Sequence, residues 1–210
     1  MSLSARGIAR HFLQRTGALS VGQVFFDGGG GTHSLRERLE TLARQEISFD
    51  GSECIYAITA RYQQTWSRIS IRVQLAPDAE ITAETMASLQ GTWEGTIELR
   101  WSNRWGIGRP GEATCQLTFD VQWVTMNPHH TVRVRVGPAR SNMTLWDTMD
   151  TGAVAAHEFG HMHGNPDEYP DAACTSRNPV STGTVMDNNS DTIPARLMQR
   201  LADNVGSNIV

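Results

Sequence analysis

The sequence predicts an α+β fold, and three observations point to this class. The chain has 210 residues, which is the length of one domain with a short extension. Hydrophobic residues make up 39% and charged residues 19%, and both values are typical of globular proteins. Most segments with strand-like alternation precede the helical patterns of the C-terminal third, and this grouping favours α+β over alternating α/β architectures.

The chain is predicted to divide into an N-terminal extension and a single domain. Residues 1–31 are expected to form an extension or leader, which ends in a run of glycines typical of a flexible joint. Residues 32–210 are expected to form a single domain. Its first element is predicted to be a helix from Ser34, because Glu37 stands three residues later and completes a capping box.

Strands are predicted where apolar and polar residues alternate, because successive side chains of a strand point to opposite faces. The predicted strands cover residues 55–62, 69–75, 97–101, 115–123 and 132–136. His129 and His130 precede the last of these strands at a predicted turn, where we expect solvated side chains.

Helices are predicted where apolar residues recur every three or four positions. Besides the helix from Ser34, the predicted helices cover residues 82–95, 152–163 and 194–205. The last one carries Pro194 in its first turn, where proline is favoured.

Composition excludes two broad classes of partner. The net charge is −4 and the isoelectric point is about 6.0, whereas general nucleic-acid binders usually carry a basic excess. No segment approaches the roughly 20 apolar residues of a membrane-spanning helix. We therefore expect no nucleic acid, no membrane span and a monomer as the favoured state.

The cysteines and the N-terminus bear on the cellular compartment. Cys54, Cys115 and Cys174 are widely spaced and odd in number, which favours free, partly buried thiols over one pair with a leftover. The N-terminus lacks the apolar core of a secretory signal. The expectation is a protein that is cytoplasmic as synthesised, is a mature form, or leaves by a route that needs no such signal.

The chemistry of the chain is concentrated in one motif. His157 and His161 are spaced i, i+4, so a helix places both on one face, where they can bind one metal ion. Glu158 lies beside them without being a ligand. Such a short motif also occurs in helices with two ordinary histidines, but here Gly164 can end the helix and reverse the chain. That turn would return Asp167 to the metal as a third ligand.

The extended pattern HExxHxxGxxD resembles the metzincin zinc peptidases, with Asp167 at the third-ligand position. HEFGH followed by DEY is also similar to the bacterial IgA-peptidase group, although the acidic pair falls one residue later there. The resemblance implies a methionine-containing turn, for which Met186 is suited, and a C-terminal helix, for which residues 194–205 are suited. It also implies a twisted, mostly antiparallel or mixed sheet packed on helices. Some metzincins carry a metal-contacting tyrosine just after the turn, where Asp187 stands here.

These residues predict a zinc-dependent endopeptidase that acts on protein or peptide substrates. Two imidazoles and a carboxylate leave an open position on one zinc ion for water, and Glu158 is the expected general base. The substrate backbone is expected to add to an edge strand at residues 142–146 or 132–136. The alternative is a non-catalytic zinc-binding module. The compact architecture is also similar to toxin or effector zincins that specialised bacterial secretion systems deliver.

Three neighbours of the motif keep alternative interpretations. Glu168 could replace Asp167 as the third ligand. His163 could be an additional ligand, although its spacing from His161 turns it to another side of a helix. Tyr169 could stabilise an oxyanion or could simply pack.

Overall fold

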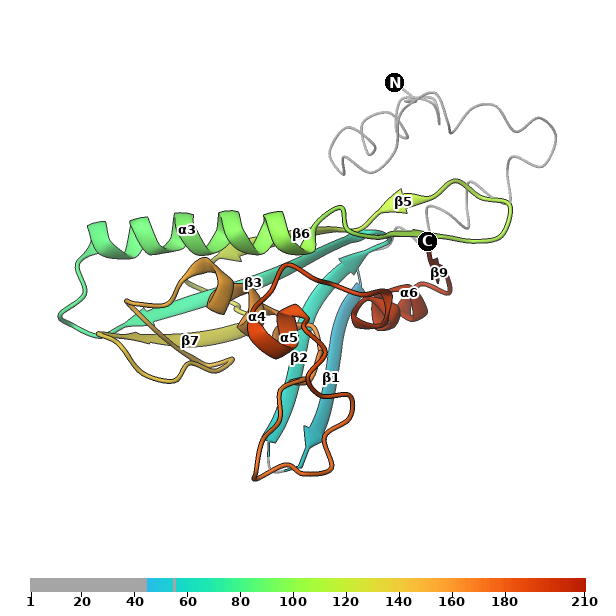
Figure 1. Cartoon of the computed structure of the whole chain (residues 1–210). Helices are drawn as coiled ribbons and strands as arrows, with labels where there is room; N and C mark the ends of the chain where they lie inside the picture. Colours follow the sequence, from blue (N-terminus) through green and yellow to red (C-terminus); the bar gives the residue numbers. More distant parts are fainter. Residues whose placement is uncertain (1–44, 55) are drawn as a thin grey trace, which may run out of the picture.

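The fold is described from a computed structural model, which covers residues 45–54 and 56–210 (Figure 1). The predicted N-terminal extension and the predicted helix from Ser34 lie outside the described residues. The boundary at residue 31 therefore stays a prediction.

A six-stranded mixed sheet forms the centre of the molecule, and this sheet with its helices is compatible with the predicted α+β class (Figure 1). The strands are β1 (Gln45–Glu53), β2 (Tyr56–Thr65), β3 (Arg68–Pro77), β6 (Thr118–Trp123), β7 (His130–Arg135) and β8 (Leu145–Asp147). Strands β1 to β3 are antiparallel, whereas β3 pairs in parallel with β6 and β7, and β7 with β8. The first half of β3 pairs with β6 and its second half pairs with β7.

Alternation predicted most of these strands. The predicted strands 55–62, 69–75 and 132–136 correspond to β2, β3 and β7. The core face of β3 carries Ile69, Ile71 and Val73, all fully buried. The predicted strand 115–123 is divided into β6 and β5 (Cys115–Gln116), and β5 belongs to a second, three-stranded sheet with β4 (Gly106–Gly108) and β9 (Asn208–Ile209).

The predicted strand 97–101 is wrong, because these residues form the last turns of α3 (Ala83–Trp101). Trp93, Ile97 and Trp101 are spaced by four residues and are fully buried, whereas Leu99 is 74% exposed. The buried helical stripe therefore determines the structure. Residues that are four positions apart are also an even number of positions apart, so a helical stripe can look like strand alternation in a short segment. α3 begins after Thr82, whose hydroxyl accepts from the amide of Thr85.

Helix α4 (Gly152–Met162) confirms the predicted helix 152–163 and lies against both α3 and β2. The hydroxyl of Thr151 accepts a hydrogen bond from the amide of Val154 and caps the helix. A Cβ atom at Gly152 would lie 2.1 Å from Oγ1 of Thr96 in α3, so this close approach requires glycine. Small residues thus let a short apolar helix enter the core.

The C-terminal helix is shorter than predicted. After α5 (Val185–Asn188), residues 194–205 form a 3-10 turn η1 (Ala195–Leu197) followed by α6 (Gln199–Asn204). Pro194 has an extended conformation and lies before the helix rather than inside its first turn. The expected apolar stripe is nevertheless buried, since Leu197, Leu201 and Val205 are at most 6% exposed.

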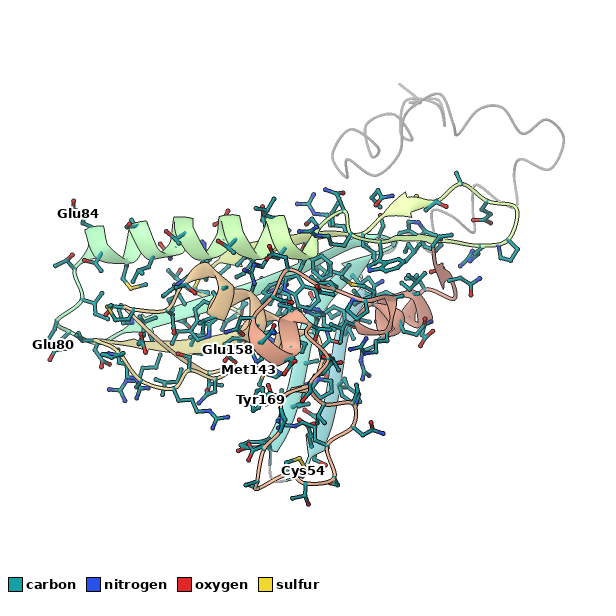
Figure 2. The ribbon with its side chains drawn as sticks, viewed as in Figure 1. Cys54, Glu80, Glu84, Met143, Glu158 and Tyr169 are labelled. Carbon is teal, nitrogen blue, oxygen red and sulfur yellow. A yellow bond between two sulfur atoms is a disulfide. The ribbon has the colours of Figure 1, made fainter. Side chains whose placement is uncertain are left out.

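Two expectations about polar residues are wrong. Cys54 and Cys174 form a disulfide, which joins the tip of the β1–β2 hairpin to the segment after the metal motif (Figure 2). Sequence spacing did not indicate this pair because the two cysteines are 120 residues apart. His130 is also not solvated: it is 6% exposed, and its Nε2 atom lies 2.9 Å from the carbonyl oxygen of Arg61.

In the part of the chain that is described, no helix combines the length and apolar character required to cross a membrane.

Candidate metal centre

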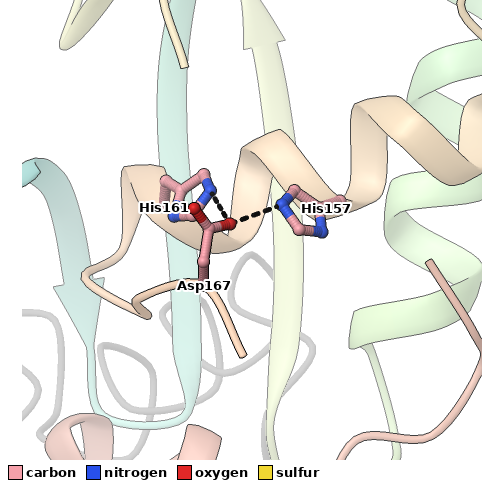
Figure 3. A group of neighbouring side chains, drawn as sticks. All are labelled: His157, His161 and Asp167. Atoms are coloured by element: carbon pink, nitrogen blue, oxygen red, sulfur yellow. Dashed lines mark hydrogen bonds and ion pairs between the residues drawn. The ribbon is translucent and has the colours of Figure 1, made fainter. Parts of the chain in front are cut away.

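Helix α4 presents two histidines from one face. His157 and His161 are separated by one turn, and their ring centroids lie 5.0 Å apart. Both rings point toward the carboxylate of Asp167 (Figure 3). The i, i+4 spacing in the sequence therefore produces the expected juxtaposition.

The turn after α4 brings Asp167 back to the helix. Gly164 has a φ of +101°, a conformation that side-chain-bearing residues rarely adopt, and the amide of Asn165 donates to the carbonyl of Gly160. Oδ1 of Asp167 then lies 3.0 Å from His157 Nε2 and 3.2 Å from His161 Nε2. The three potential ligand atoms lie within 4.8 Å of one another.

The contacts of the two Nδ1 atoms fix how the Nε2 atoms of His157 and His161 are oriented. Nδ1 of His157 lies 2.8 Å from the carbonyl oxygen of Val185, and Nδ1 of His161 lies 2.7 Å from that of Asn165. Each Nδ1 must donate a proton to its carbonyl, so in the neutral rings both Nε2 atoms carry lone pairs. Two lone pairs and the carboxylate of Asp167 then converge, and such a donor set is suited to a cation.

The pKa values of these groups reflect the same convergence. Burial favours a raised pKa for Asp167, but the hydrogen bonds with His157 and His161 outweigh it and hold the pKa far below the ordinary value. Burial favours a lowered pKa for His161, but Asp167 and the charge of Glu158 outweigh it and raise the pKa. The carboxylate is thus ionised and attracts positive charge into the site.

Glu158 lies beside the donor group without belonging to it. The residue is 5% exposed, and its Oε2 atom has no hydrogen-bond partner among the described residues. Oε2 lies 4.0 Å from His161 Nε2. Burial raises the pKa of this carboxyl group, which increases its basicity once it is ionised. A buried carboxylate oxygen without a hydrogen-bond partner requires an explanation, and a catalytic role is one such explanation.

Arg177 supports the third donor, and sequence reasoning missed it. Its side chain is 1% exposed, and its guanidinium lies 3.3 Å from Oδ2 of Asp167 and 2.9 Å from Oε1 of Glu53. It also donates to the carbonyl of Tyr169. Nothing in the spacing of the motif indicates this residue, because the loop between Asp167 and Arg177 has no periodic pattern.

The structure puts Glu168 outside the donor group. Its carboxylate is 2% exposed, forms an ion pair with Arg196 and accepts from the hydroxyls of Thr182 and Thr184. Its main-chain amide donates to the carbonyl of Met186. Glu168 therefore joins the segment after α4 to the segment around Met186, and its neighbour Asp167 is the residue beside the histidines.

Met186 is fully buried beneath α4. A Cβ atom at Gly160 would lie 2.3 Å from the sulfur of Met186, so the glycine within HEFGH makes room for this methionine. Val185 next to it provides the carbonyl that orients His157. The segment suited to the methionine-containing turn thus lies directly below the donor group.

Two further candidates occupy different surroundings. His163 is 2% exposed, and its ring contacts those of Trp101, Phe119 and Phe159 at centroid distances of 4.5, 5.2 and 5.4 Å. Burial lowers the pKa of His163 to about 3, so the ring is a neutral part of the core, turned away from the donors. The Tyr169 hydroxyl accepts from Arg140 at 2.6 Å.

A cleft of about 500 Å³ opens above the donors. One wall comes from β2 and includes Tyr56, Ala57 and Ile58, and the other comes from residues 140–144. His157, Glu158, His161, Asp167 and Tyr169 also line the cleft. The donor group and Glu158 are therefore accessible to a molecule bound between two walls.

Comparisons with protein-family models, curated proteins and solved structures give no match to this chain. What the site can do therefore follows from its own donors and their surroundings.

Proposed function

We propose that the chain is a zinc-dependent endopeptidase of the metzincin type. The observation that carries this proposal is the convergence of His157 Nε2, His161 Nε2 and Asp167 Oδ1 beside the unpaired Oε2 of Glu158 in an open cleft. Two nitrogens and one carboxylate oxygen are a catalytic rather than a structural zinc set, because a structural site uses four protein ligands.

The donor set fits zinc. The two Nδ1 contacts to main-chain carbonyls leave both Nε2 atoms as lone-pair donors, and the low pKa of Asp167 provides a negative charge. When bound, zinc supplies Lewis-acid chemistry, which acidifies water and polarises a carbonyl group. His157, His161 and Asp167 are the residues that would hold it.

The residues of the chain account for the proton transfers of peptide hydrolysis. Glu158 accepts a proton from the attacking water through its free Oε2 and then donates it to the leaving amine. Its raised pKa makes the carboxylate a stronger base than an exposed glutamate. Tyr169 and Arg140 line the cleft together with the donor group, and the Tyr169 hydroxyl accepts a hydrogen bond from Arg140.

Replacing Glu158 by Gln tests the proposal. The amide keeps the size of the side chain but cannot accept the proton, so kcat for cleavage of unfolded casein is expected to fall by about 10²–10⁴-fold. Zinc content and the thermal midpoint should remain those of the wild type. A Glu158→Gln protein with wild-type kcat would contradict the peptidase assignment. A zinc-loaded wild type that cleaves no protein would also contradict it, and this is the result expected of a non-catalytic zinc module.

We also infer that the protein works in an oxidising compartment or after export. The disulfide between Cys54 and Cys174 supports this, because disulfides rarely persist in reducing cytoplasm. Mass spectrometry of the protein from its native cells, alkylated before lysis, is expected to find this disulfide. Two alkylated thiols would contradict the inference.

A further inference from the structure

One wall of the cleft carries Arg140, and hydrogen bonds to two carboxylates hold the main chain on both sides of it. Before Arg140, the amide of Ala139 donates to Oδ2 of Asp147 at 2.7 Å. After it, the hydroxyl of Ser141 donates to Oδ2 of Asp150 at 2.6 Å. The backbone of Arg140 is therefore fixed beside the cleft.

The side chain of Arg140 is held near the donor group by Tyr169. Its Nη2 atom donates to the Tyr169 hydroxyl at 2.6 Å, and its guanidinium carbon lies 5.7 Å from the centroid of the tyrosine ring. The centroid of the same ring lies 6.3 Å from that of His157. Tyr169 and Glu158 both line the cleft (Figure 2). One aromatic ring thus separates Arg140 from the metal donors.

Most of the hydrogen-bonding capacity of this guanidinium is unused. A guanidinium has five N–H groups, and in the described part of the chain the Tyr169 hydroxyl is the only group that accepts from Arg140. Asp171 is near enough to influence Arg140, but its oxygens accept from the Tyr56 hydroxyl and the Ala173 amide. A fixed guanidinium with free N–H groups is suited to bind a carboxylate through two parallel hydrogen bonds.

Arg140 also provides the exposed positive charge of the cleft. The chain contains no lysine, and Arg140 is the only arginine among the described residues that line the cleft. Of the carboxylates that line it, Glu53 and Asp167 pair with Arg177, and Glu158 is 5% exposed. Arg140, in contrast, is exposed to solvent. An anionic group that enters the cleft therefore meets a positive charge at its wall.

We propose that Arg140 is a specificity-determining residue, which selects polypeptides that carry an aspartate or glutamate side chain close to the cleaved bond. The proposal rests on the proposed peptidase function and names the substrate class within it. An endopeptidase cuts inside a chain, so the carboxylate belongs to a side chain and not to a chain terminus. An extended chain rises about 3.3 Å per residue, so the acidic residue is expected within about three positions of the cleaved bond.

Substrate peptides with and without the carboxylate test the proposal. The cuts that the wild type makes in unfolded, dephosphorylated casein are mapped by mass spectrometry, and acidic residues should recur at one fixed position near the cut. A peptide around such a site, amidated at its C-terminus, is then compared with the same peptide carrying the amide isostere at this position. The wild type is expected to cleave the acidic peptide with a kcat/KM about 10-fold higher, because hydrogen bonds to a charged group are the stronger ones.

Variants of Arg140 assign this preference to one side chain. In Arg140→Gln, the ratio of kcat/KM between the acidic and the amide peptide should fall to about 1, and Arg140→Glu should prefer a peptide with lysine at this position. The matched control is Arg104→Gln. Arg104 is exposed outside the cleft and donates to the main-chain carbonyls of Arg100 and Leu99. This control should keep the wild-type ratio.

A second measurement uses the wild type and does not depend on how a variant folds. Salt screens the attraction between an exposed guanidinium and a carboxylate, since the Debye length falls from about 10 Å at 0.1 M to about 3 Å at 1 M ionic strength. The ratio between the acidic and the amide peptide should therefore fall about threefold over this range. A ratio that does not change with salt would contradict selection by charge.

The outcomes separate the two proposals. A wild type that cleaves casein but cleaves the acidic and the amide peptide equally overturns the role of Arg140 and leaves the peptidase function standing. A preference that persists in Arg140→Gln has the same consequence. A wild type that cleaves no polypeptide overturns the peptidase function and the selectivity with it.

Discussion

Residues 152–188 and the β1–β2 hairpin at residues 45–65 both border the cleft, but they do so in different ways. The first region carries the three donors on one helix and the turn after it, so the contacts among these donors span ten residues or fewer, as between His157 and Asp167. The hairpin reaches the site only through distant contacts, such as Glu53 with Arg177, 124 residues apart. The site thus combines a locally encoded donor group with a wall contributed from far away in the sequence.

The comparison teaches that the donors need support from outside their motif. Arg177 holds the second oxygen of Asp167 and is itself held by Glu53 at the tip of the hairpin. The disulfide between Cys54 and Cys174 joins the same two segments beside this ion pair. The hairpin therefore both shapes the cleft and fixes the loop that positions Asp167.

Removing the disulfide is the strongest way to break this connection. Cys54→Ser with Cys174→Ser opens a cross-link that closes 120 residues, and loop-closure entropy predicts a loss of about 4–5 kcal/mol in the free energy of unfolding. Urea denaturation of the oxidised wild type and the double variant measures this loss. Equal unfolding midpoints would show that the hairpin is held without the cross-link.

Arg177→Met is expected to have the next largest effect. The change leaves the carboxylates of Glu53 and Asp167 without their buried cation, which predicts a loss of about 3 kcal/mol in unfolding free energy. Zinc affinity should also fall by about 10–100-fold, because Arg177 supports a ligand from outside. Arg133→Met is the control: its pair with Asp78 is exposed to solvent and should contribute little to the unfolding free energy. Equal losses in the two variants would contradict the role of Arg177.

Acidification is expected to lower the free energy of unfolding by a smaller amount, through His130. This buried histidine at the start of β7 contacts the main-chain carbonyl of Arg61 in β2. Burial lowers the pKa of His130 to about 4 in the folded state, whereas the unfolded value is about 6.5. The unfolded chain binds the extra proton between these values, so stability falls as the pH drops below about 6.5. The expected loss of unfolding free energy from His130 between pH 7 and pH 5 is about 2 kcal/mol. His130→Gln should reduce the pH slope of the unfolding free energy by about one proton, and an unchanged slope would exclude His130 as its source.

Particular residues show how far the sequence predicts this molecule. The pairing of His157 with His161 follows from helical spacing, and the return of Asp167 follows from the turn at Gly164. The alternation of β3 and β7 predicted their strands because each has one buried face. The sequence does not predict the strand β1, because Ile47 and Phe49 are the only partly buried hydrophobic residues of this mostly polar edge strand.

Other features could not be predicted because their causes are not local. Three such features depend on segments that only the fold brings together. They are the disulfide, the ion pairs of Arg177, and the contact of His130 with the main chain of β2. The sequence alone does not decide between Asp167 and Glu168 as the third donor, because they are adjacent carboxylates. Contacts with residues outside the motif distinguish them, such as the ion pair of Glu168 with Arg196 and that of Asp167 with Arg177. Sequence spacing thus indicates the donors, and tertiary contacts determine which oxygen faces them.

The most direct measurement of the central claim is the zinc content of the purified chain and of Asp167→Ala after equilibration with excess zinc and gel filtration. The wild type is expected to retain about one zinc ion per chain. Asp167→Ala should retain little, because removing a ligand costs more affinity than the roughly 10–100-fold of an outer contact. Asp171→Asn changes a carboxylate on the same loop that lies outside the donor group, and this control should retain about one zinc ion per chain. A wild type without zinc, or an Asp167→Ala protein that binds zinc as tightly as the wild type, would contradict the account.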